Sequence, residues 1–127
     1  MKVKLKPDAA SKDLIWLDFD DVLMVLGIED KTDTGVNFLL WSCKQESCIL
    51  MPASKFDLID DSLSCRWVIS LGFKGKIGLF PKAWLADEFW EEFHDDVPEA
   101  VEIFWREFES MKKNILKSEA SEKVYAE

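Results

Sequence analysis

Five short segments predict β-strands: the first and the fourth alternate hydrophobic and polar residues with a period of two, and the others are short, mainly apolar runs beside polar connections. The segments are residues 1–6, 36–43, 48–51, 66–73 and 76–80. The first carries lysines on its polar side, and we expect a short edge strand that these charges protect from pairing. The second is apolar on both faces, as a central strand would be. Short polar connections join the second segment to the third and the fourth to the fifth, so each pair predicts a β-hairpin.

A period of about 3.6 residues, typical of amphipathic helices, occurs twice near the C-terminus. One helix is predicted from Pro81, with Leu85, Phe89 and Phe93 on one side, and a second from the capping-box spacing at residues 96–99 to Leu116. A third, short helix is predicted over residues 14–28, because aspartates stand where a helix would begin and a glycine stands where it would end. Residues 29–35 and 57–64 are expected to be connections.

These elements predict an α+β fold in which an antiparallel sheet of about four or five strands packs against two C-terminal helices. The chain has 127 residues, and we expect a single domain over residues 1–116 with a flexible tail at 117–127. No apolar stretch approaches the roughly 20 residues of a membrane span, and the first residues lack the apolar segment of a signal peptide. We therefore expect a soluble, cytoplasmic protein without a membrane partner.

The charge of the chain favours a basic partner. Sixteen basic and 25 acidic side chains give a net charge of −9, which opposes binding to nucleic acid. Residues 84–109 contain ten acidic residues and one basic residue, so this window is as negative as the whole chain. At 100° per residue, Trp84 projects among these carboxylates and Ile103 falls between two of them, an exposed position typical of binding anchors. The predicted partner-binding residues are Trp84, Asp87, Glu88, Glu91, Glu92, Asp95, Glu99 and Ile103.

Three cysteines and the single histidine are the candidates for metal binding. The spacing of Cys43 and Cys48 is loose for zinc, and no second close pair follows around Cys65. We expect reduced, structural thiols, and we expect His94 to interact with a helix C-terminus. No metal and no cofactor is predicted.

The segment LIWLDFDDVL, residues 14–23, resembles the first motif of haloacid-dehalogenase-type phosphatases, an apolar strand that ends in Asp-x-Asp. The resemblance implies Asp18 as the nucleophile and Asp20 as the acid/base beside a magnesium ion. It also implies a serine at the end of a later strand, for which Ser70 is the candidate, and a lysine, at Lys74 or Lys76. The alternative interpretation is a helix whose first turn carries the aspartates.

Small size, negative charge, many aromatic residues and the lack of a catalytic set resemble the general character of bacterial immunity proteins that neutralise cationic nuclease toxins. The resemblance is one of character, without a specific motif. It implies a non-enzymatic acidic protein whose carboxylates occupy a basic cleft. The alternatives are the phosphatase and an acidic subunit of a larger complex.

Overall fold

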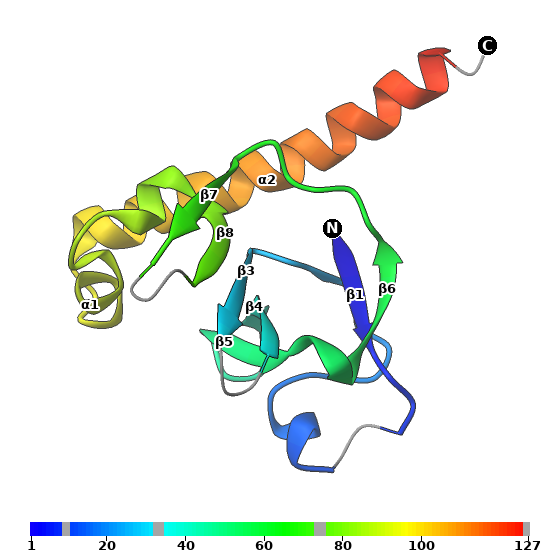
Figure 1. Ribbon diagram of the computed structural model, residues 1–127, viewed down its shortest axis with the longest axis horizontal. Helices are drawn as coiled ribbons and strands as arrows, with labels where there is room; N and C mark the ends of the chain where they lie inside the picture. Colours follow the sequence, from blue (N-terminus) through cyan, green and yellow to red (C-terminus); the bar gives the residue numbers. More distant parts are fainter. Residues whose placement is uncertain (9–10, 32–34, 73–75, 126–127) are drawn as a thin grey trace. The chain divides into compact units, whose positions relative to one another are not determined.

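The computed structural model describes residues 1–8, 11–31, 35–72 and 76–125, the last twelve of these by backbone alone. Two antiparallel sheets are followed by helices (Figure 1). The predicted α+β class with C-terminal helices is confirmed, although the strands form two sheets where one was expected. None of the described helices is both long enough and apolar enough to cross a membrane.

The first sheet has three strands in the order β2-β1-β6. These are β1 (Lys2–Leu5), β2 (Leu23–Met24) and β6 (Phe56–Asp60). The expected alternation in β1 is confirmed, because Val3 and Leu5 are buried. The prediction of an edge strand is wrong, since β1 pairs on both sides. A period-two pattern reports which side chains are buried, and it carries no information on how many backbone edges are paired.

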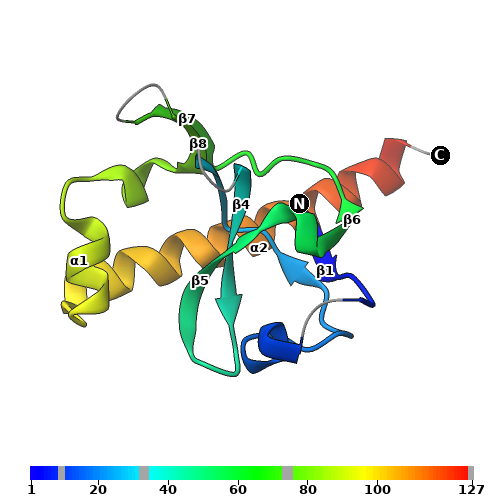
Figure 2. The ribbon, with the colours of Figure 1, turned by 60° about the horizontal axis from the view of Figure 1, so that its bottom comes forward.

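The second sheet has five strands in the order β5-β4-β3-β8-β7. They are β3 (Gly27–Lys31), β4 (Gly35–Ser42), β5 (Ser47–Pro52), β7 (Trp67–Leu71) and β8 (Ile77–Pro81). Both predicted hairpins are confirmed, and β4 and β5 lie side by side in register from Ser42↔Ser47 to Asn37↔Pro52 (Figure 2). The predicted central position of β4 is also confirmed, and Leu40 in its middle is fully buried.

The helix predicted over residues 14–28 is wrong. A short 3-10 helix, η1 (Ser11–Ile15), is followed by turns and then by β2 and β3. The amides of Val25 and Leu26 donate to the carbonyls of Met1 and Leu39, at 2.9 and 2.8 Å. Pairing with distant strands therefore replaces the local hydrogen bonds of a helix. For the same reason residues 29–31 and 57–60, which were expected in connections, belong to β3 and β6.

The C-terminal part consists of a 3-10 turn, η4 (Lys82–Leu85), and the helices α1 (Phe89–His94) and α2 (Pro98–Tyr125). The predicted helix start at Pro81 is wrong, because Pro81 ends β8 and Glu88, in the left-handed conformation with φ 65°, precedes α1. α2 begins with proline at its first position, which a helix tolerates. It continues past Leu116 to Tyr125, and the flexibility of residues 117–127 stays a prediction.

Two compact units divide the chain. The sheet unit contains Met1–Leu63 and Ile69–Leu79, and the helical unit contains Ser64–Val68 and Phe80–Glu127. The hairpin of β7 and β8 contributes residues to both units. That residues 1–116 fold as a single domain stays a prediction.

Candidate protein-binding surface

Carboxylates line one side of α1. Glu91 and Glu92 lie in α1, and Glu88 and Asp95, directly before and after it, continue the i, i+3, i+4, i+7 spacing. All four are exposed, whereas Phe89 on the other side is 4% exposed. The short helix therefore separates an acidic side from an aromatic side, as the sequence pattern indicates.

Three more exposed carboxylates flank this helix, and together the seven form what we call the acidic surface. Its members are Asp87, Glu88, Glu91, Glu92, Asp95, Asp96 and Glu99. Within the described part of the chain, none of the seven takes part in an ion pair. Their charges are therefore left to interact with solvent or with another molecule.

Glu107 does not belong to this surface, although it lies in the acidic window of the sequence. It is 7% exposed, and both of its carboxylate oxygens accept hydrogen bonds from Arg66, from Nε at 2.9 Å and from Nη2 at 2.7 Å. The hydrogen bonds and the charge of Glu107 raise the pKa of Arg66. Farther along the surface of α2, Glu102 is paired with Arg106 at 2.7 Å. Glu102 and Glu107 are thus paired within the helical unit, whereas the seven carboxylates of the acidic surface form no ion pair with a described residue.

The prediction that Trp84 projects into solvent is wrong. Its side chain is 1% exposed and stacks on Phe104, with ring centroids 5.0 Å apart, and it meets the edge of Trp90 at 5.6 Å. The predicted direction requires one continuous helix from Pro81, whereas extended Ala86 and left-handed Glu88 separate η4 from α1. This change of direction turns the indole into the core.

Ile103, the other predicted apolar anchor, is half-buried. Among the side chains of the helical unit that the structure describes, Trp105 is an exposed aromatic residue, with 37% exposure. Its exposure was not predicted, although the helical angle of Trp105 places it on the same side of α2 as Glu102 and Glu109. A tryptophan at this exposure retains a large apolar surface that a partner can cover.

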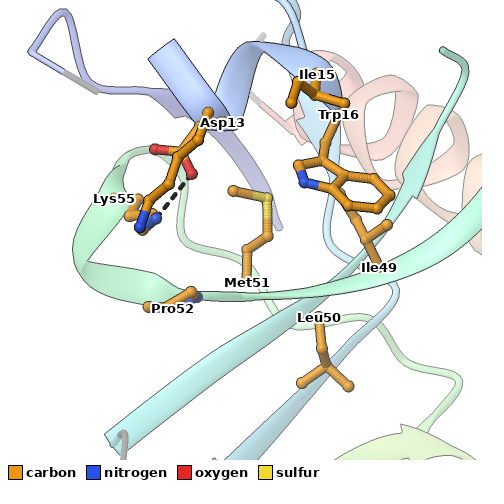
Figure 3. Close-up of a pocket in the computed structure, with 9 residues that line it drawn as sticks. Asp13, Ile15, Trp16, Ile49, Leu50, Met51, Pro52 and Lys55 are labelled. Carbon is orange, nitrogen blue, oxygen red and sulfur yellow. Dashed lines mark hydrogen bonds and ion pairs between the residues drawn. The ribbon is translucent and has the colours of Figure 1, made fainter. Parts of the chain in front are cut away.

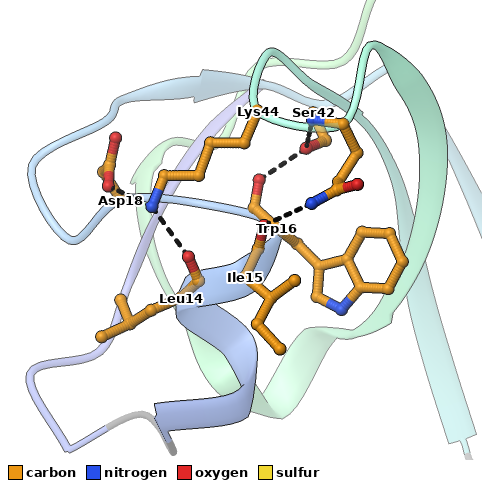
Figure 4. A network of polar contacts seen from close by, with 7 residues as sticks. Leu14, Ile15, Trp16, Asp18, Ser42 and Lys44 are labelled. Atoms are coloured by element: carbon orange, nitrogen blue, oxygen red, sulfur yellow. Dashed lines mark hydrogen bonds and ion pairs between the residues drawn. The ribbon is translucent and has the colours of Figure 1, made fainter.

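The Asp-x-Asp segment is held by the turn between β4 and β5 (Figure 4). Lys44 forms an ion pair with Asp18 at 2.6 Å and donates to the Leu14 carbonyl at 2.7 Å. Ser42 Oγ donates to the Trp16 carbonyl at 2.6 Å. Residues 14–17 form the end of η1 and a turn. The apolar strand that the phosphatase resemblance implies is therefore not formed, and Lys74 lies outside the described residues.

The cysteines are all free thiols. Cys43 and Cys65 are exposed in turns, and Cys48 lies in β5, where burial raises the pKa of its thiol to about 12. Among the described residues, no group of three or more His, Cys, Asp or Glu side chains is placed to hold a metal ion. His94 is the last residue of α1, at the helix C-terminus with which it was expected to interact. Its ring contacts Trp90 and Phe93.

No protein-family model, curated protein or solved structure matches the chain.

Proposed function

We propose that the protein is a non-enzymatic binding protein whose acidic surface binds a basic protein, in the way that an immunity protein inhibits a cationic toxin. The observation that carries the proposal is the row of exposed carboxylates on one side of α1, none of which forms an ion pair with a described residue. A cationic surface would supply the missing counter-charges.

The electrostatics favour rapid capture of such a partner. Like charges placed side by side on a short helix repel each other, and a basic partner removes that repulsion. The summed field of the surface also steers a cationic protein toward it and increases the association rate. Both effects decrease as salt screens the charges.

Charge alone gives little affinity, and an apolar anchor is needed. Trp105 supplies the anchor that was predicted at Trp84, since Trp105 is exposed and belongs to the same helical unit as the acidic surface. The proposed partner therefore has a basic surface with an apolar depression.

A nuclease toxin fits this description, because its cleft is basic where it binds phosphates. Carboxylates spaced along α1 would occupy the positions of the phosphates and compete with the nucleic acid. We place this inhibition in the cytoplasm, where a nuclease toxin meets its substrate.

The test compares two variants that change the net charge equally. Glu88→Lys/Glu91→Lys reverses charges on the acidic surface, and Asp20→Lys/Asp21→Lys reverses two exposed aspartates in the sheet unit. Basic proteins captured from a lysate of the source cells are quantified for the wild type and both variants. We expect the first variant to lose the captured protein and the second to retain it. Equal capture by the wild type and both variants would show that the acidic surface is only solvated.

A further inference from the structure

We propose a second binding site, in the sheet unit, where an extended peptide segment of a partner protein pairs with the open edge of β5. The site is a cavity of about 490 Å³ between η1 and β5 (Figure 3). It is lined by Lys12, Asp13, Ile15, Trp16, Ile49, Leu50, Met51, Pro52 and Lys55. This inference is independent of the acidic surface.

The cavity follows the edge of the strand. Ile49, Leu50, Met51 and Pro52 are consecutive in β5, and all four line it. Consecutive residues of a strand point to opposite faces, so a cavity over one face would be lined by every second residue. A cavity that touches four in a row reaches the backbone at the strand's edge.

That edge is open. β5 is the last strand of its sheet and pairs with β4, and no other described strand lies beside it. The edge of a sheet presents unpaired N–H and C=O groups, which an added strand can satisfy. An extended peptide is the ligand whose hydrogen bonds repeat at the spacing of these groups.

Apolar side chains form one end of the cavity. Trp16 and Ile15 are 39% and 57% exposed, and Figure 3 shows the indole above Ile49. Their backbone is fixed in place, because Gln45 Nε2 donates to the Ile15 carbonyl at 3.0 Å and Ser42 Oγ to the Trp16 carbonyl at 2.6 Å (Figure 4). Apolar surface on a fixed backbone binds a side chain at a low entropic cost.

At the other end of the cavity, a partly buried ion pair has a carboxylate oxygen and ammonium protons that are still able to form hydrogen bonds. Asp13 is 4% exposed, and its Oδ1 accepts from Lys55 Nζ at 2.7 Å. Its Oδ2 is buried without a hydrogen-bond partner. A buried acceptor without a donor is unfavourable, and the ammonium group of Lys55 has further protons to donate.

A peptide group matches this pair. After a rotation of the Asp13 carboxylate, the peptide N–H can donate to the free oxygen, and the peptide carbonyl can accept from Lys55. A small anion has less to gain here, because Asp13 already neutralises Lys55. The predicted ligand is an extended segment with apolar side chains at alternate positions.

Phage-displayed random heptapeptides selected on the full chain test this proposal. Affinities of the selected peptides are measured for the wild type, for Trp16→Ala and for Ile69→Ala, a matched control on β7 at the opposite edge of the same sheet. Each selected peptide is also synthesised with N-methyl groups at single positions, which remove one N–H at a time.

We expect peptides with alternating apolar residues, whose affinity falls at least about tenfold with Trp16→Ala and is unchanged with Ile69→Ala. N-methylation should abolish binding at every second position, because alternate N–H groups face the strand. The proposal is overturned if no peptide is enriched, if Trp16→Ala and N-methylation leave affinity unchanged, or if anilinonaphthalene sulfonate fills the cavity and no peptide displaces it.

Discussion

Replacement of Trp84 by alanine should destabilise the protein far more than the loss of a surface residue would. The indole is 1% exposed and is enclosed by the rings of Phe89, Trp90 and Phe104. Removal of roughly 200 Å² of buried apolar surface at about 25 cal/mol per Å² costs about 5 kcal/mol. Measured truncations of buried aromatic residues cost about 3–5 kcal/mol, so we expect a loss of about 4 kcal/mol.

Two further variants separate the effect of losing the aromatic ring from that of losing the indole N–H, and the effect at a buried position from that at an exposed one. Trp84→Phe keeps an aromatic ring and removes the indole N–H, which is buried without a partner, so we expect it to cost less than about 2 kcal/mol. Trp105→Ala, at a position that is 37% exposed, should also cost less than Trp84→Ala.

The assay is denaturant unfolding followed by circular dichroism, with the midpoint and the slope m fitted for each variant. A lower midpoint at constant m reports a change in the free energy of unfolding. If Trp84→Ala leaves the midpoint unchanged and weakens binding to a basic partner, the indole lies on the surface and the packing described above is wrong.

Three further predictions follow from single interactions. Arg66→Ala leaves the carboxylate of Glu107 buried and unpaired and should lower the free energy of unfolding by about 2 kcal/mol, and a double-mutant cycle with Glu107→Gln should show the two positions to be coupled. Cys48, with its pKa raised to about 12, should react with iodoacetamide much more slowly than exposed Cys43 in the native protein, as peptide mapping by mass spectrometry can measure. Hydrogen bonds from Ser62 lower the pKa of Asp60, so the ionised carboxylate should stabilise the fold at neutral pH by less than about 1 kcal/mol. The difference in the free energy of unfolding between the wild type and Asp60→Asn should vanish as acid protonates this carboxylate. A difference that does not depend on pH would show that the ionised carboxylate is not its cause.

The sequence predicted those parts of the fold in which local periodicity and long-range pairing agree. The hairpin of β4 and β5 is an example, because its apolar runs are separated by a short polar connection. Residues 14–28 are the opposite case. Their aspartates and Gly27 are compatible with a helix, and the choice between helix and strand depends on partners at Met1 and Leu39 that no local pattern identifies.

For the candidate sites too, the sequence predicted only the features that depend on a local pattern. The acidic side of α1 could be predicted because four carboxylates follow the period of a helix. The position of Trp84 could not, since two residues with non-helical backbone, Ala86 and Glu88, redirect the chain after it. The cavity beside β5 gave no signal in the sequence, because it combines residues that are more than 30 positions apart in the chain.

The most direct test of the proposed function is the association rate constant of the captured basic protein, measured from low to high salt. Stopped-flow mixing is carried out with the wild type, with Glu88→Lys/Glu91→Lys and with the equally charged Asp20→Lys/Asp21→Lys. We predict that the first variant associates more slowly at low salt and shows a weaker salt dependence, while the second follows the wild type more closely. If the two variants show the same rates and the same salt dependence, only the net charge matters, and the acidic surface is not the binding site.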